Sequence, residues 1–129
     1  MGLFSRSSYV VEVSPTNFNK RTKKLIPPVD MMGKKGMIVF SASWCGHCKR
    51  AAPEIEKTAK ILGKSFIIYN MDCDKYGEFA SKALNVNGYP TIVFVDSDGT
   101  PIKLYTGERS TQSFLEAVCD VSMVCPMIA

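Results

Sequence analysis

The sequence lacks an apolar run of about 18–20 residues, the length that a membrane-crossing helix needs. It also lacks the long apolar segment of a secretory signal, and its last four residues, 126–129, are not an ER-retention tag. Gly2 follows Met1 as in a myristoylation signal, but Arg6 stands where that signal has Ser or Thr. These absences predict a soluble chain of the cytoplasm, a virion or another reducing compartment.

Chemically distinctive side chains are few, with one histidine, one tryptophan and five cysteines in 129 residues. An odd number of cysteines cannot all pair within one chain, and their spacing is not that of a disulfide-stapled scaffold. Cys45 and Cys48 form a Cys-x-x-Cys pair, whereas Cys73, Cys119 and Cys125 stand apart. The pattern predicts redox chemistry or metal binding rather than structural bridges.

Negative charge is scarce in the first part of the chain. Residues 1–53 carry nine Lys or Arg and two acids, a charge of +7, whereas the remainder carries seven and ten, a charge of −3. The basic cluster at 20–24 has no aromatic residues interleaved in the manner of a base-stacking surface. We therefore expect a solvated basic face and no nucleic-acid partner.

Hydrophobic periodicity predicts alternating strands and helices. The helix that follows the cysteine pair has apolar residues every three or four positions to residue 62, and the next helix has Asp74 as its expected cap. The chain shows no repeat and no linker, so all 129 residues are expected to form one α/β domain. The expected strands are 9–13, 37–40, 66–69, 91–95 and 102–105, and the expected helices are 48–62, 75–85 and 110–121.

The cysteine pair lies where a buried strand gives way to a helix. Cys45 is expected at the helix N-terminus, where free N–H groups and the helix dipole favour a thiolate, which is the attacking species. Cys48 follows one turn later and faces inward, where burial raises the pKa of a thiol. A charged His47 would further favour the thiolate of Cys45, which makes the pair a stronger oxidant.

Three other interpretations of the pair compete with this one. The two cysteines are half of a zinc site that Cys73 and His47 complete, although no second Cys-x-x-Cys exists. Alternatively, they form an inert structural disulfide. The third alternative is a redox-silent module that binds cysteine-containing partners.

The sequence resembles a catalytic domain of the protein disulfide isomerase family, within the thioredoxin superfamily. Residues 44–49, Trp-Cys-Gly-His-Cys-Lys, match that family's active-site sequence, and residues 52–60 resemble its active-site helix. Residues 88–91, Gly-Tyr-Pro-Thr, resemble its cis-proline loop, and 105–109 its last strand and turn. The resemblance covers about residues 9–120, between a short N-terminal extension and an apolar C-terminal tail.

The resemblance implies a thioredoxin fold, with a central mixed sheet flanked by helices on both faces. It implies a thiol–disulfide oxidoreductase or isomerase that acts on protein cysteines, with a thioredoxin-like reductant as a second enzymatic possibility. No metal or organic cofactor is expected, because the disulfide of the pair carries the electrons. The expected partners of a monomer are protein or peptide thiols and disulfides, with glutathione or a reductase as electron partner.

The same resemblance assigns roles to individual residues. Tyr89 and Pro90 are expected to form a cis peptide beside the cysteines, which leaves the backbone of Tyr89 free to pair with an extended substrate. Trp44 is expected to cover the site and contact substrate, with an ordinary core position as the alternative. Arg109 is expected to approach the buried cysteine and lower its pKa, with an exposed turn as the alternative. The expected catalytic residues are Cys45, Gly46, His47 and Cys48.

One departure concerns the proton of Cys48. The family buries an acid six residues before its first active-site cysteine, and this sequence has Val39 there. The usual lysine partner is replaced by Asn70 or a neighbour, so both halves of a buried charged pair are missing together. The spacing of Cys73, Cys119 and Cys125 leaves their roles open.

Overall fold

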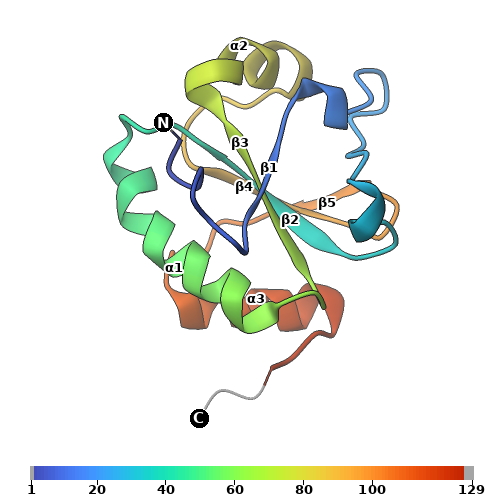
Figure 1. Ribbon diagram of the computed structural model, residues 1–129, viewed down its shortest axis with the longest axis vertical. Helices are drawn as coiled ribbons and strands as arrows, with labels where there is room; N and C mark the ends of the chain where they lie inside the picture. The colour runs from blue at the N-terminus through green and yellow to red at the C-terminus, as the bar shows by residue number, and fades with distance from the viewer. Residues whose placement is uncertain (1, 127–129) are drawn as a thin grey trace.

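A computed structural model describes residues 2–126 and places a five-stranded mixed sheet at the centre of the molecule (Figure 1). The strand order is β1-β3-β2-β4-β5; β1, β3 and β2 run parallel, and β4 and β5 run antiparallel to their neighbours. The strands are β1 (Val11–Val13), β2 (Gly36–Ser41), β3 (Ile67–Asp72), β4 (Thr91–Val95) and β5 (Pro101–Leu104). The helices are α1 (Gly46–Leu62), α2 (Cys73–Leu84) and α3 (Thr111–Ser122), with short 3-10 turns η1 (Pro15–Asn17) and η2 (Val29–Met31).

Helices cover both faces of this sheet. α1 and α3 lie on one face, where Ile55 and Phe114 enter one core, and α2 lies on the other, where Ala80 enters a second (Figure 1). Every residue of β2 is buried, because the strand is central and covered on both sides. The architecture confirms the mixed sheet with helices on both faces that the sequence predicts.

The start of α2 differs from the prediction. Asp72, and not Asp74, is the N-cap, because its carboxylate accepts the backbone N–H of Asp74 at 3.0 Å. The expected cap was therefore wrong by two residues. β3 also runs three residues further than predicted, to Asp72, so Cys73 opens the helix directly at the end of a central strand.

The β4–β5 hairpin turns at Gly99, as predicted, with a φ of +87°. A Cβ at Gly99 would lie 1.9 Å from the carbonyl oxygen of Leu25, so the position also needs glycine for space. The backbone N–H of Leu25 donates to the Gly99 carbonyl at 2.9 Å. The hairpin thereby fastens the loop that precedes β2.

Both chain ends pack onto this frame. Phe4 is buried in the core under α1, and the Ser7 hydroxyl donates to both carboxylate oxygens of Glu56 at 2.7 and 2.6 Å. After α3 the chain reverses, and a disulfide joins Cys119 to Cys125. The sequence left the roles of these two cysteines open, and the structure pairs them. The end of the predicted tail, residues 127–129, lies outside the described residues.

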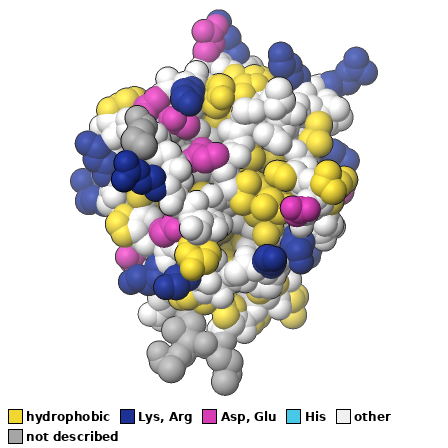
Figure 2. Space-filling model, in the orientation of Figure 1, with side chains coloured by type: hydrophobic (Ala, Val, Ile, Leu, Met, Phe, Trp, Pro, Cys, Tyr) yellow, Lys and Arg dark blue, Asp and Glu magenta, His cyan; other side chains and the backbone are white. Residues whose placement is uncertain are grey.

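The basic cluster lies on the surface, with Lys20, Arg21 and Lys23 exposed and Lys24 3.3 Å from the carboxylate of Asp98. In Figure 2, Lys and Arg side chains project mainly around the rim of the visible face, and hydrophobic side chains gather to the right of its centre. Among residues 2–126, no helix has the length and apolar character needed to cross a membrane.

Candidate active site

The cysteine pair lies at the junction of β2 and α1. Cys45 is the N-cap of α1, and its sulfur accepts the backbone N–H of Cys48 at 3.4 Å. Both cysteines are free thiols, and their exposed fractions are 7% for Cys45 and 2% for Cys48. The two sulfurs therefore share the start of one helix, the position that the sequence predicts for a reactive dithiol.

The environment of Cys45 lowers its pKa. Burial, the largest single influence, raises the pKa, but hydrogen bonds from the Cys48 side chain and from the backbone N–H groups of Cys48 and His47 act against burial. The charge of Arg109 also lowers the pKa. The sum favours the thiolate, because these donors bind the charged form more strongly than the thiol.

The environment of Cys48 acts in the opposite direction. Burial, together with the neighbouring Cys45, raises the pKa of Cys48 to about 12, against the backbone N–H of Ala42 and the charge of Arg109. When the pair loses one proton, the negative charge therefore falls on Cys45, while Cys48 keeps its proton. Arg109 itself is exposed, and its charge acts on both sulfurs from the surface.

The loop before β4 faces the pair. The Tyr89–Pro90 peptide is cis, as the resemblance implies, and the Cys45 thiol donates to the Tyr89 carbonyl at 3.4 Å. The backbone of Tyr89 was expected to be free for substrate. Its carbonyl, however, already accepts a hydrogen bond from the Cys45 thiol. Trp44 is 70% exposed and lies edge-on to the Tyr89 ring, 5.9 Å between ring centres, so Trp44 is not a core residue.

Arg50 is a site residue that the sequence analysis missed. Its guanidinium lies 2.9 Å from Nδ1 of His47, and because a guanidinium only donates, Nδ1 must accept. The contact places the guanidinium of Arg50, a fixed positive charge, beside the ring of His47. A Cβ at Gly46 would lie 3.3 Å from the Arg50 guanidinium, so glycine leaves room for this contact. The three-residue helical spacing from His47 is the signal that could have revealed it.

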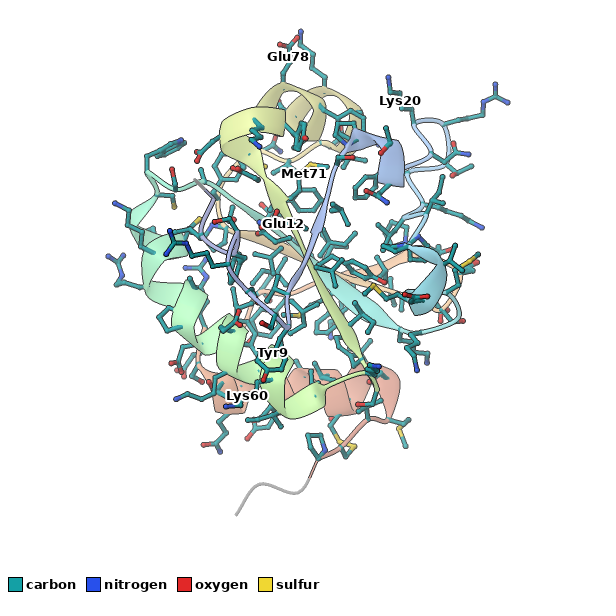
Figure 3. The ribbon with its side chains drawn as sticks, in the orientation of Figure 1. Tyr9, Glu12, Lys20, Lys60, Met71 and Glu78 are labelled. Carbon is teal, nitrogen blue, oxygen red and sulfur yellow. A yellow bond between two sulfur atoms is a disulfide. The ribbon has the colours of Figure 1, made fainter. Side chains whose placement is uncertain are left out.

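A polar row crosses the sheet beside the site. Val39, fully buried, pairs in register with Asn70, which pairs with Glu12 of β1. Glu12 is labelled in Figure 3. The buried amide of Asn70 accepts the Ser41 hydroxyl at 2.7 Å and donates to the Glu12 carboxylate at 3.2 and 3.3 Å. Desolvation raises the pKa of Glu12, and the hydrogen bond from Asn70 opposes that shift. Hydrogen bonds of the uncharged Ser41 and Asn70 side chains thus occupy the place of the missing charged pair, and the Glu12 carboxylate ends the row.

Cys73 lies at the same edge of the sheet as the pair, on the α2 side. Its thiol is buried and donates to the Met71 carbonyl at 3.6 Å. Within residues 2–126, no group of three or more His, Cys, Asp or Glu side chains lies close enough to hold a metal ion.

Together these features define a class of protein. It is a thioredoxin-fold domain with a dithiol at the N-terminus of α1 and a cis-proline loop that packs against the dithiol. The thioredoxin family model matches residues 9–120. The chain belongs to the thioredoxin family.

Its relatives include protein disulfide isomerases. The chain is 33% identical to protein disulfide isomerase-like 2-2 of Oryza sativa subsp. japonica, over 89% of this chain and 29% of the relative. It is 32% identical to human protein disulfide-isomerase A6, over 90% of this chain and 24% of the relative. The chain thus spans less than a third of the length of these relatives.

Solved structures share the fold. The J-Trx1 fragment of ERdj5 superimposes with a TM-score of 0.72 at 19% identity, over 92% of this chain and 54% of the fragment. The short form of spinach chloroplast thioredoxin F gives a TM-score of 0.65 at 24% identity, over 88% of this chain and 94% of that one.

Proposed function

We propose that the chain is a thiol–disulfide oxidoreductase or isomerase that acts on protein cysteines through Cys45 and Cys48. The observation that carries the proposal is the opposite shift of two neighbouring thiols, with the pKa of Cys45 lowered and that of Cys48 raised to about 12. One sulfur is thereby ready to attack, and the other is held in reserve. The protein disulfide isomerase relatives support this activity.

In the reductive direction, the Cys45 thiolate attacks one sulfur of a substrate disulfide, and the other substrate sulfur leaves as a thiolate. Cys48 then loses its proton and attacks the Cys45 sulfur of the mixed disulfide, which releases the second substrate thiolate. Two electrons pass to the substrate, and a Cys45–Cys48 disulfide remains. Oxidation of a substrate runs through the same steps in reverse. In isomerisation, another substrate thiolate attacks the mixed disulfide and releases Cys45 before Cys48 can form a disulfide with it.

The surrounding residues bind and orient the substrate. Trp44 offers an exposed aromatic surface beside the pair, and Tyr89 and Pro90 face an extended substrate segment, whose backbone would compete with the Cys45 thiol for the Tyr89 carbonyl. Arg109 favours the thiolate forms that each exchange step needs. No organic cofactor is required, because the pair itself stores the electrons.

Two assays test the proposal. Reduction of insulin and reactivation of scrambled RNase by the wild-type chain, both lost in Cys45→Ser, are the expected result. Insulin reduction alone identifies a thioredoxin-like reductant, driven by a reductase or by glutathione. Activity in neither assay identifies a module that binds cysteine-containing partners without turnover and contradicts the proposal.

We also propose that the chain works where disulfides persist. The sequence predicts a reducing compartment, but the Cys119–Cys125 bond is of a kind that cytosolic thiol systems keep reduced. Acid quenching of cells followed by alkylation measures the state of this pair, and a fully reduced pair contradicts the proposal.

A further inference from the structure

Tyr89 is the one described residue that packs both against the cluster of Ala42, Cys45 and Cys48 and against the core under α2. Its backbone carbonyl accepts a hydrogen bond from the Cys45 thiol, and its ring makes an edge-on contact with the ring of Trp44. Its hydroxyl extends to α2, on the far side of the loop. Tyr89 thus connects the reactive sulfur, through its backbone carbonyl, with α2, through its side-chain hydroxyl.

The start of α2 forms a seat for this hydroxyl. The thiol of Cys73 gives its hydrogen to the Met71 carbonyl. Cys73 and Tyr89 pack in the same core, where interaction with the Tyr89 hydroxyl lowers the pKa of Cys73. Four residues later Gly77 has no side chain, and a Cβ there would lie 3.3 Å from the hydroxyl oxygen. Between them the helix departs from helical angles at Tyr76, with φ −115° and ψ 22°.

Both groups of this contact stay neutral at physiological pH. Burial raises the pKa of Cys73 to about 11, against the hydrogen bond from Tyr89. Burial, followed by the nearby Cys73, raises the pKa of Tyr89 to about 12. The contact is therefore an ordinary hydrogen bond between uncharged groups rather than a third reactive thiolate.

We propose that Tyr89 is a positioning residue whose hydroxyl, seated between Cys73 and Gly77, fixes the cis-proline loop against Cys45 and holds Trp44 beside the pair. The inference rests on the proposed function and extends it to α2. The thiol-to-carbonyl contact at 3.4 Å is a weak hydrogen bond on one side of the loop. The hydroxyl on α2 supplies the second attachment point, on the opposite side of the ring.

Tyr89→Phe removes only the hydroxyl and keeps the ring and the carbonyl. Because Trp44 is the single tryptophan, its emission in the reduced protein reports the position of the loop without turnover. We expect a shifted Trp44 emission spectrum. We also expect a KM for insulin that rises about three- to tenfold with kcat within about twofold, since one neutral hydrogen bond is lost from a binding surface.

Three further variants separate positioning from general destabilisation. Cys73→Ala should reproduce the effects of Tyr89→Phe, whereas Cys73→Ser should retain wild-type behaviour because its hydroxyl can accept the same hydrogen bond. Tyr69→Phe, which removes a hydroxyl from a buried tyrosine of the same core, is the matched control and should change neither quantity.

The proposal is overturned if Tyr89→Phe and Cys73→Ala leave both emission and KM at wild-type values. It is also overturned if Tyr69→Phe alters them to the same extent. Failure of the proposed function would appear differently, as a wild-type chain without insulin reduction. The emission comparison would then still decide whether the hydroxyl holds the loop.

Discussion

Two sulfurs one helical turn apart differ in acidity because one caps the helix and the other lies beneath it. Cys45 receives N–H donors and the field of Arg109, whereas Cys48 faces apolar neighbours, and its pKa rises to about 12. The difference orders the chemistry, since the thiolate attacks first and the thiol resolves later. No other charged side chain needs to contact the pair for this order to hold.

The first prediction follows from this difference. Alkylation of Cys45 by iodoacetamide should proceed at neutral pH and reach its plateau below the usual range for thiols. Alkylation of Cys48 should rise only as the pH approaches about 12.

In the same way, Cys48→Ser should accumulate mixed disulfides on Cys45, and Cys45→Ser should accumulate few. Mass spectrometry of the labelled peptides measures both, and adducts mainly on Cys48 would reverse the assignment.

The second prediction concerns redox poise. With His47 where thioredoxin has proline, the potential of the pair should lie nearer about −180 mV than about −270 mV. His47→Pro should move it toward the lower value. Equilibration with glutathione measures both proteins. A wild-type value at or below about −270 mV would mean that His47 does not set the potential.

Among the elements, the three parallel strands decide how Cys48 can lose its proton. Their register aligns Val39, Asn70 and Glu12 in one row, so the carboxylate of this row stands at the edge strand, two strands away from β2. The amide of Asn70 lies between them and carries no charge. The position of the buried acid beside Cys48 is therefore taken by the aliphatic side chain of Val39, which accepts no proton.

The third prediction tests that replacement. Val39→Glu should speed the resolution of mixed disulfides, because a positioned general base is typically worth about 10²–10⁴-fold. It should also lower the free energy of unfolding by about 3 kcal/mol or more, since the buried carboxylate lacks a cation. Adding Asn70→Lys should recover part of that loss. Single-turnover kinetics and urea unfolding measure the two effects.

Val39→Gln is the control, since it matches the glutamate in size but has no carboxylate. It should destabilise the fold without accelerating resolution. If Val39→Glu leaves the resolution rate unchanged, loss of the Cys48 proton does not limit that step.

How far the sequence predicts the elements depends on whether a feature is local. The helix after Cys45 and the cis peptide at Pro90 follow from contiguous residues, and both were predicted. The contacts of Asn70 with Glu12 and Ser41 depend on register across three strands, which no local pattern contains. The N-cap at Asp72 was missed because two aspartates flank Cys73 and only the length of β3 selects between them.

At the scale of the whole molecule, the first and the last described segments of the chain pack against the same core, between the sheet and helices α1 and α3. Phe4 enters the core beneath α1, and Val124 packs against the same core from the tail. The Cys119–Cys125 bond holds that tail after α3 ends at Ser122. The sequence could not rank this pairing, because it depends on the chain reversal at Met123, whose φ is +63°.

The fourth prediction concerns this bond. Cys125→Ser should lower the free energy of unfolding by about 2 kcal/mol, because the short loop between residues 119 and 125 is no longer closed in the unfolded chain. Urea unfolding without reductant measures the difference. Repeating both unfolding curves in reductant is the control, and there the difference should disappear. Equal stability without reductant would mean that the bond does not form in solution.

The five cysteines divide into the active-site pair Cys45 and Cys48, the tail disulfide between Cys119 and Cys125, and the single Cys73. Because their number is odd, one thiol always remains when the others are paired. With the tail closed, the chain alternates between three titratable thiols and one as its pair opens and closes. It never reaches zero, because Cys73 has no counterpart within the chain. Conversion of every thiol of this protein into a disulfide would therefore require a second thiol-bearing molecule bonded to Cys73, and the burial of that sulfur opposes such a bond in the folded form.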